Sequence, residues 1–174
     1  MAAHHSWAGL HGDLLAAKVS VYDPCGFACS QPVPEPESAE YAADAFTIDG
    51  LSVRFRVAKT TPTKVGQFVT VWQRSEEGPI RPFDTEDGVD LFVVSSRDSG
   101  SFGQFMFPRD VLCERGIVSR NRSGGKRGFR VYPPWVTRTN RQARSTQAWQ
   151  VNYFLYLGED RPVDVERAKA LYHP

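Results

Sequence analysis

The strongest constraint on the fold is an alternation of apolar and polar residues over residues 46–57, which read FTIDGLSVRFRV. The alternating apolar positions are Phe46, Ile48, Leu51, Val53, Phe55 and Val57. A period of two is that of a strand with one buried face, and the Asp49-Gly50 pair between the two runs favours a tight hairpin turn. The segment therefore predicts a β-hairpin, and other parts of the chain must cover its apolar face.

Four further runs of β-branched and aromatic residues are bounded by turn residues and predict strands. They are QFVTVWQ (67–73), VDLFVVSS (89–96), FGQFMF (102–107) and FRVYP (129–133). Apolar spacing, alanine content or an opening proline predicts helices over residues 9–22, 37–46, 108–116, 141–150 and 161–172. Residues 23–36 and 76–88 are predicted loops, while residues 151–157 fit either a continued helix or a last strand. The expected class is α+β, mainly β, with a barrel or a strongly curved sheet.

The chain has 174 residues, a length that suits one domain with a core that needs no metal or disulfide. Its apolar runs fall short of the roughly 20 residues that span a bilayer, and its first residues lack the charged-then-apolar order of a signal peptide. Three cysteines, an odd number, fit a reducing compartment. We therefore expect a single domain over residues 1–174, located in the cytoplasm and away from membranes.

Charge is segregated along the chain although the net charge is only +1. Residues 1–50 carry a net charge of −6, residues 51–150 carry +8 and residues 151–174 carry −1. Between Arg115 and Gly158 there are nine basic residues and no Asp or Glu. A segment of one sign favours an anionic partner. The alternative is that these cations pair with acids from elsewhere in the fold.

Common catalytic and metal-binding patterns are missing. All four histidines, His4, His5, His11 and His173, lie near the ends, where a core nucleophile–histidine site is not expected. The cysteines lack core histidines that would complete a zinc site. No lysine has an acid two positions before it, the spacing of restriction-type nucleases, and the SGGKR segment lacks the rest of a phosphate-binding loop. We predict no catalytic residue, no metal and no cofactor.

Three clusters instead combine phosphate-binding cations, amides that hydrogen-bond base edges, and aromatic rings that stack. The first lies at residues 59–74, the second at 126–132 and the third at 135–149. The predicted nucleic-acid-binding residues are Lys59, Thr61, Lys64, Gln67, Trp72, Arg74, Lys126, Arg127, Arg130, Arg138, Arg141, Gln142 and Gln147. For the tryptophans the alternative is burial in the core.

At these clusters the sequence resembles the MepB family of small bacterial proteins. The matching motifs are EPESAEYAADAF (35–46), FRVAKTTPTKVGQFVTVWQR (55–74), GQFMFP (103–108), GGKRGFRVYPPW (124–135) and QARSTQAWQVNYF (142–154). The resemblance implies a DNA-binding pseudobarrel of mixed strands with flanking short helices, similar to the N-terminal recognition domain of EcoRII-like restriction enzymes. Residues 35–158 would form this barrel, 1–34 a leading helix and proline-rich loop, and 159–174 a C-terminal helix. Two arms would grip duplex DNA, one running from the KTTPTK turn to Arg74 and one at SGGKRGFR.

The leading hypothesis is therefore non-enzymatic binding of nucleic acid, most directly double-stranded DNA. A metal-dependent enzyme acting on nucleic acid or a phosphorylated ligand is the alternative, with its acids in the DTEDGVD loop. Those candidate acids are Asp84, Glu86, Asp87 and Asp90. A third possibility is an interaction module whose basic face docks an acidic protein.

Overall fold

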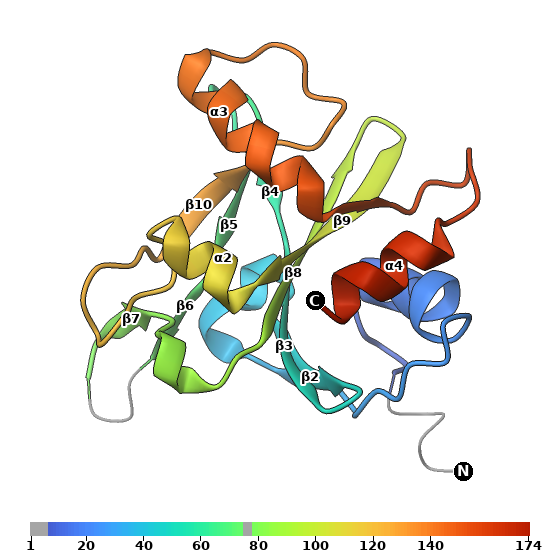
Figure 1. Cartoon of the computed structure of the whole chain (residues 1–174), viewed down its shortest axis with the longest axis horizontal. Helices are drawn as coiled ribbons and strands as arrows, with labels where there is room; N and C mark the ends of the chain where they lie inside the picture. Colours follow the sequence, from blue (N-terminus) through green and yellow to red (C-terminus); the bar gives the residue numbers. More distant parts are fainter. Residues whose placement is uncertain (1–6, 75–77) are drawn as a thin grey trace.

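The computed structural model describes residues 7–74 and 78–174, and its strands there form three open sheets (Figure 1). The largest sheet has the order β1-β2-β3-β8-β9-β11. Its strands are β1 (Val33–Pro34), β2 (Asp44–Ile48), β3 (Leu51–Val57), β8 (Leu91–Asp98), β9 (Ser101–Pro108) and β11 (Phe154–Tyr156). A second sheet has the order β10-β5-β4, from β10 (Gly128–Val131), β5 (Gln67–Thr70) and β4 (Lys59–Thr60). The third pairs β6 (Trp72–Arg74) with β7 (Ile80–Pro82).

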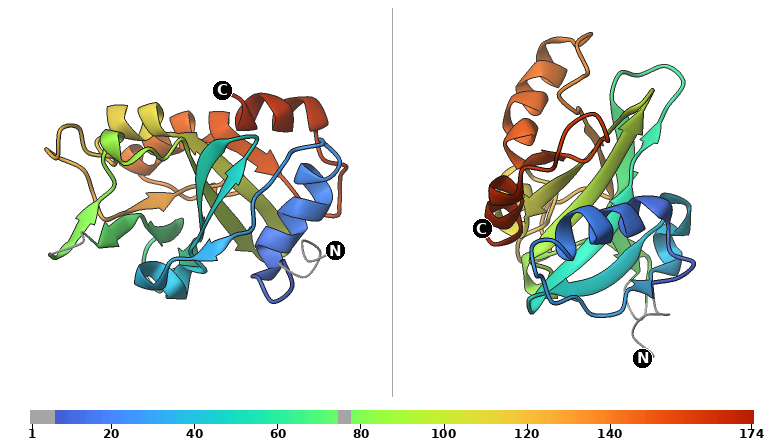
Figure 2. Two further views of the ribbon diagram at one scale, coloured as in Figure 1. Left: turned by 90° about the horizontal axis from the view of Figure 1, so that it is seen from below. Right: turned by 90° about the vertical axis from the view of Figure 1, so that its right-hand side faces the viewer.

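The helices are short, and several of them lie along one side of the strands. They are α1 (Gly12–Ala17), which continues as a π-helix (Lys18–Tyr22), α2 (Arg109–Glu114), α3 (Arg141–Gln150) and α4 (Val165–Tyr172). Short 3₁₀ helices span Pro36–Tyr41, Thr85–Asp87 and Val151–Tyr153. Figure 2 (left) shows α2, α3 and α4 on one side of the strands and the first 3₁₀ helix on the other. The chain is thus mainly β with a few short helices, as its patterns predict.

The predicted hairpin is confirmed by the β2–β3 ladder, in which Phe46 lies opposite Val53 and Ile48 opposite Leu51. Asp49 (φ 49°) and Gly50 (φ 84°) both take the left-handed conformation that a two-residue hairpin turn requires. The sheet is mixed, because β3 then pairs with β8 in parallel. That pairing, across a long connection, makes the hairpin part of a larger sheet, in which β1 lies outside β2.

Both faces of the large sheet are buried, each against a different apolar cluster. Leu91 and Val93 of β8 belong to one cluster, while Phe92 and Val94 belong to the other. The first cluster contains residues of α1, the π-helix and α4, and the second contains residues of β5, β10 and α2. The alternating sides of a strand explain why one continuous apolar run, LFVV, serves both.

The two ends of the chain complete the first cluster together. The hydroxyls of Tyr22 and Tyr172 lie 3.1 Å apart in the interior, and burial raises the pKa of both groups. Asp13 at the start of α1 is 4% exposed, and it accepts hydrogen bonds from Ser95 Oγ (2.8 Å) and Arg97 Nη2 (2.9 Å). Residues outside the recognised motifs therefore bury one face of the sheet. Within the described ranges no helix is both long and apolar enough to cross a membrane.

Some local predictions need correction. Residues 37–46 do not form one helix. A 3₁₀ helix ends at Tyr41 and β2 begins at Asp44, because residues from Asp44 onward pair with β3 in the hairpin. The described part of the predicted loop 76–88 holds β7 and a 3₁₀ turn, while residues 76 and 77 lie outside the described residues, as do His4 and His5. The ambiguous residues 151–157 form a 3₁₀ turn followed by β11.

Candidate nucleic-acid interface

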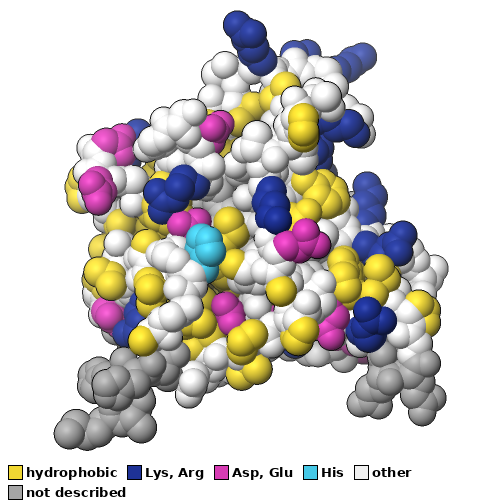
Figure 3. Space-filling view, turned by 180° about the vertical axis from the view of Figure 1, so that it is seen from behind, with side chains coloured by type: hydrophobic (Ala, Val, Ile, Leu, Met, Phe, Trp, Pro, Cys, Tyr) yellow, Lys and Arg dark blue, Asp and Glu magenta, His cyan; other side chains and the backbone are white. Residues whose placement is uncertain are grey.

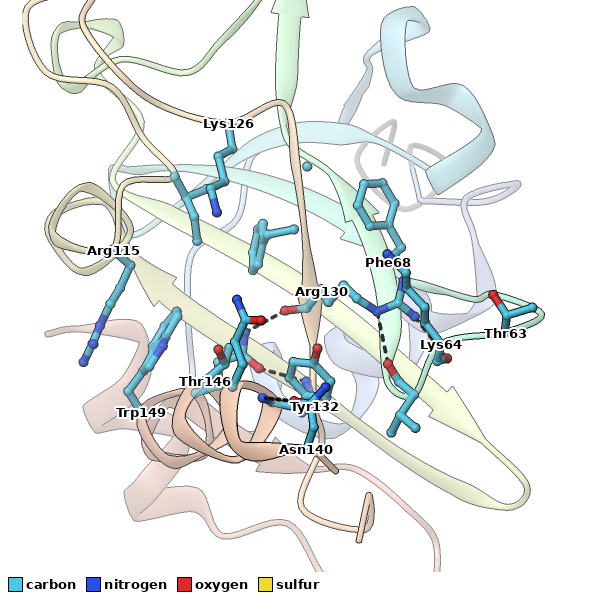
Figure 4. A pocket seen from close by; sticks show the side chains of 17 residues that line it. Thr63, Lys64, Phe68, Arg115, Lys126, Arg130, Tyr132, Asn140, Thr146 and Trp149 are labelled. Carbon is cyan, nitrogen blue, oxygen red and sulfur yellow. Dashed lines mark hydrogen bonds between the residues drawn. The ribbon is translucent and has the colours of Figure 1, made fainter. Parts of the chain in front are cut away.

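A cleft with a volume of about 670 Å³ opens between β5, β10, α3 and the turn of residues 61–66 (Figure 4). We call it the basic cleft. Four segments that are distant in the sequence line it, and in the described part of the chain its charged lining residues are all basic. The lining residues are Thr63, Lys64, Val65, Phe68, Arg115, Ile117, Lys126, Gly128, Phe129, Arg130, Tyr132, Asn140, Gln142, Ala143, Thr146, Trp149 and Gln150.

The antiparallel β5–β10 ladder forms the floor of the basic cleft. Along β5 and β10 the residues alternate between buried and half-buried, so that one face packs on the second cluster and the other faces the cleft. Phe68 lies on the cleft side, opposite Arg130 in the ladder. Its ring lies over Gly128, where an added Cβ would come 2.4 Å from the Phe68 ring. Glycine at this position therefore leaves room for the tip of the ring to approach the backbone closely.

Helix α3 forms one wall, and amide side chains fix its position. The Asn140 side chain caps the helix by accepting from the Ala143 N–H at 2.8 Å. Gln150, fully buried, accepts from the Tyr132 N–H (2.8 Å) and donates to the Arg130 carbonyl (2.9 Å). These two bonds cover the free edge of β10 and tie the end of α3 to it. The wall is consequently held to the floor by side chains rather than by a sheet ladder.

The cations of the cleft come from both sides of β10. Figure 4 shows Lys126 and Arg115 at one side and Lys64 at the other, with Arg130 between them. The Arg115 guanidinium lies 4.9 Å from the centre of the Trp149 ring. Such a contact holds a cation without neutralising it.

The acid-free segment forms no direct ion pair with Asp or Glu among the described residues, although the charge of Arg122 contributes to lowering the pKa of Asp84. Of its nine basic side chains, all except Arg130 are exposed. Among residues 7–74 and 78–174, the ion pairs to Asp and Glu involve other cations and His173. The alternative interpretation, pairing with acids from elsewhere in the fold, is therefore not what the described residues do.

Arg130, predicted as a direct phosphate contact, instead holds the turn of residues 61–66. Its guanidinium donates to Thr61 Oγ1 (2.7 Å) and to the carbonyls of Lys64 (3.3 Å), Val65 (3.0 Å) and Gly66 (3.1 Å). Thr61 is likewise engaged in this contact. Arg130 therefore positions the turn and presents Lys64, whose side chain is exposed.

Two of the predicted base-reading amides are used inside the fold. Gln67 is 5% exposed and hydrogen-bonds Ser96 Oγ, Thr60 Oγ1 (3.1 Å) and the Arg97 carbonyl (2.9 Å). The Gln147 amide donates to the carbonyls of Pro133 (2.8 Å) and Val136 (2.9 Å), which fixes the segment before α3. We therefore remove both from the set of base-reading side chains, because their amide donors already have protein partners. Gln142 is exposed and lines the basic cleft.

The turn and Arg74 do not form one arm. The turn precedes β5, whereas Trp72 and Arg74 lie in β6 beyond its other end, where the Val71 N–H donates to the Arg127 carbonyl. At about 3.3 Å per residue, β5 alone separates them by roughly 13 Å. Trp72 is half-buried and Arg74 is exposed. The start of β6 is thus joined to the loop that carries Arg127, and not to the turn.

Of the other predicted cations, Lys59 is partly compensated and Arg138 is not. Lys59 Nζ lies 3.8 Å from Glu40 Oε2 and 4.8 Å from the centre of the Tyr41 ring. Arg138 is exposed and lines a smaller cavity of about 340 Å³. Lys64 lines that cavity as well as the basic cleft, so the turn stands between the two.

The basic loop, residues 120–127, is shaped by backbone conformation and by one carboxylate. Asn121, Arg122, Gly124 and Gly125 all have positive φ. Asp84 Oδ1 accepts from Ser119 Oγ (2.6 Å) and from the Arg122 N–H (2.7 Å). These bonds, the Ser119 hydroxyl first, lower the pKa of Asp84. The loop is thereby held with Lys126 and Arg127 exposed.

Three of the four acids proposed for the enzyme alternative, Asp84, Asp87 and Asp90, serve as structural hydrogen-bond acceptors, whereas Glu86 is exposed. Asp87 accepts from Gln73, Arg81 and the Asp84 N–H, and Asp90 accepts from the Ser52 N–H at 2.8 Å. Within the described ranges, no three His, Cys, Asp or Glu side chains are grouped as a metal site. Asp84, supported by Asp87, thus holds the basic loop, whereas Asp90 ties β3 to the residue before β8.

A family model described as MepB-like matches residues 35–156. The chain belongs to the MepB-like family. The crystal structure of MepB is similar to this chain with a TM-score of 0.72 and 33% sequence identity, covering 84% of this chain and 97% of MepB. A comparison with curated proteins gives no match. The resemblance inferred from the motifs is confirmed, and the whole lining of the basic cleft falls within the matched residues.

Several cleft residues were missing from the predicted binding residues, chiefly Phe68, Arg115 and Gln150, whereas Thr146 belongs to the predicted third cluster. Alternation along residues 67–70 could have placed Phe68 on the face opposite Gln67. Arg115 begins the acid-free segment, and only its charge marked it. For Gln150 we find no local signal, because its role depends on how α3 docks on β10.

Proposed function

We propose that this chain binds nucleic acid, with duplex DNA as the first candidate, and that it does so without catalysing a reaction. The observation that carries the proposal is the group of exposed, uncompensated cations around the basic cleft and the basic loop. Figure 3 supports it from the opposite side, where Lys and Arg gather at the end of the molecule near α3. Phosphates attract such cations regardless of sequence, and the release of counterions drives the binding.

The composition of the first turn of α3 also supports an anionic partner. This turn carries Arg141 and Arg144 and no acid. Cations at the positive end of a helix are unfavourable by about 0.3–1 kcal/mol each, whereas a phosphate there is favourable. A phosphate bound here would interact favourably with both arginines and with the helix N-terminus, and it would relieve the unfavourable placement of the two cations.

The proposed mode of binding is a grip between two projections. Helix α3 and the turn of residues 61–66 project from the same end of the molecule (Figure 2, right), and the basic loop follows at the far end of β5. We propose that the three sheets act together as a pseudobarrel similar to the EcoRII-like recognition domain, with these projections as its arms. A cytoplasmic location is part of the proposal, and the free thiols of Cys25, Cys29 and Cys113 support it.

The test is a titration of the protein into a fluorescently labelled, random-sequence 20-base-pair duplex. Fluorescence anisotropy measures the binding at salt concentrations from 50 to 300 mM. Contact with about five phosphates predicts a log–log salt slope of about −4 to −5. Lys126→Ala/Arg127→Ala should weaken binding to all sequences and reduce the magnitude of the slope by about 1.8. Single-stranded DNA, RNA and an acidic protein serve as competitors.

The matched control is Lys18→Ala/Arg161→Ala, which also removes two cations. Unlike Lys126 and Arg127, both of these cations form ion pairs with neighbouring acids. It should leave both affinity and slope unchanged. No duplex binding at 50 mM salt, or a slope near zero, would refute the proposal. Binding that only the acidic protein competes for would favour the interaction-module alternative.

A further inference from the structure

The basic cleft has features that duplex binding alone does not use. Its volume of about 670 Å³ is within the range of roughly 300–1,000 Å³ of small-ligand sites. A duplex is far too wide to enter it and would contact only its rim. The interior is therefore available to a smaller unit of matching chemistry.

The interior provides aromatic surface close to cations. Phe68, Tyr132 and Trp149 are half-buried and line the cleft. The Tyr132 ring lies against Gly66, where an added Cβ would come 2.7 Å from it, just as Phe68 lies over Gly128. Because these rings are half-buried, part of each remains open to the cleft, and stacking of a base on an aromatic ring contributes about 1–3 kcal/mol.

Hydrogen-bonding groups stand at the same opening. Gln142 is exposed in the first turn of α3, and Thr146 lies one turn further along the same face. Lys126 extends into the cleft from the opposite side in Figure 4. An aromatic ring system with polar edges and an attached phosphate matches this combination of stacking rings, amide and cation.

We infer that the basic cleft is a nucleotide pocket that binds one unstacked nucleoside monophosphate unit, with the base on Phe68 and the phosphate on Lys126, because the Phe68 ring lies at Gly128, two residues from Lys126. The unit has two possible sources, a free nucleotide or a nucleotide displaced from a nucleic acid. The second source rests on the proposed function. The first does not.

Two titrations separate these sources. In the first, calorimetry measures binding of dAMP and dTMP, with inorganic phosphate and deoxyribose 5-phosphate as base-free controls. In the second, anisotropy compares a fully paired duplex with the same duplex carrying a single-nucleotide bulge. The inference predicts at least tenfold tighter binding of a mononucleotide than of phosphate, or at least tenfold preference for the bulged duplex.

The decisive variant is Thr146→Trp, which fills the cleft and keeps every cation. Ala148→Trp is its matched control, because Ala148 is exposed on α3 and does not line the cleft. Thr146→Trp should weaken mononucleotide or bulge binding at least tenfold and change paired-duplex binding less than threefold. Ala148→Trp should change neither. If Thr146→Trp does not fold, Lys126→Gln, at an exposed position, should weaken mononucleotide binding at least threefold.

The outcomes distinguish this inference from the proposed function. Equal binding of phosphate and mononucleotide, without a bulge preference, would overturn the pocket while duplex binding could stand. An unchanged bulge preference in Thr146→Trp would also overturn it. Mononucleotide binding in a chain that fails to bind duplex would support the pocket and refute the proposed function.

Discussion

Replacing Arg130 tests whether this residue contacts phosphate or positions the turn of residues 61–66. Its guanidinium makes four hydrogen bonds to the turn. Because Arg130 is half-buried, we assign each bond a low value of about 0.5–1 kcal/mol. Arg130→Met should therefore raise the free energy of the closed turn by about 2–4 kcal/mol, which corresponds to an open population larger by a factor of roughly 30 to 700.

Trypsin provides the first measurement, because the turn contains the Lys64–Val65 bond. The rate of cleavage at this bond should be proportional to the fraction of molecules in which the turn is open. Arg130→Met should therefore be cleaved there at least roughly 30-fold faster. The salt dependence of duplex binding provides the second. A positioning role predicts weaker binding with an unchanged slope, whereas Lys64→Ala should reduce the slope by about 0.9.

Arg130→Lys is the matched control, because it keeps the charge and loses the planar group that reaches several acceptors at once. We expect it to loosen the turn nearly as much as Arg130→Met. Full recovery of binding in Arg130→Lys, or a slope reduced by about 0.9 in Arg130→Met, would show that Arg130 contacts phosphate directly. An unchanged cleavage rate would refute the positioning role.

Three further predictions concern the scaffold. Glu35→Gln removes the charge that lies 2.7 Å from the buried Arg56 guanidinium, and it should lower the free energy of unfolding by about 3 kcal/mol in urea titrations. Burial, and then the charge of Glu35, raises the pKa of Asp44 to about 6. The folded chain thus holds this proton more tightly than the unfolded chain, so stability should fall as pH rises from 4 through 6; Asp44→Asn should remove that fall and add about 1–3 kcal/mol at pH 7.5. Gly103→Ala would place a Cβ 2.6 Å from the Leu155 carbonyl, and should destabilise the chain by about 1–3 kcal/mol in thermal melts.

Each of these three scaffold predictions has a control that can contradict it. Glu40→Gln breaks only an exposed pair and should cost less than about 0.5 kcal/mol, so an equal loss in both variants would argue against a special role for Glu35. A pH profile that Asp44→Asn does not flatten would assign the dependence to another group. Gly12→Ala has open space around its Cβ and should be neutral or stabilising; equal destabilisation would remove the steric explanation for Gly103.

The predicted site was partly right. The position of the cations can be read from the sequence, whereas the direction in which a side chain points depends on the fold. The acid-free segment appears in the sequence, and all of its cations except Arg130 remain exposed after folding, without an ion pair to a described acid. Gln67, by contrast, has the same side chain as Gln142. One is buried because Ser96 and Arg97 of β8 supply its partners, and the other is free at a helix end.

The sequence by itself determined the hairpin, most of the strands and the segregation of charge, because each depends on residues that are close together in the chain. The tertiary structure alone decided where the basic cleft lies. Four separate segments form it, and contacts that join residues far apart, such as Gln150 with β10 and Arg130 with the turn, hold them together. Since such contacts depend on how whole elements pack, no local pattern could show which cations point into a cleft and which amides point into the core.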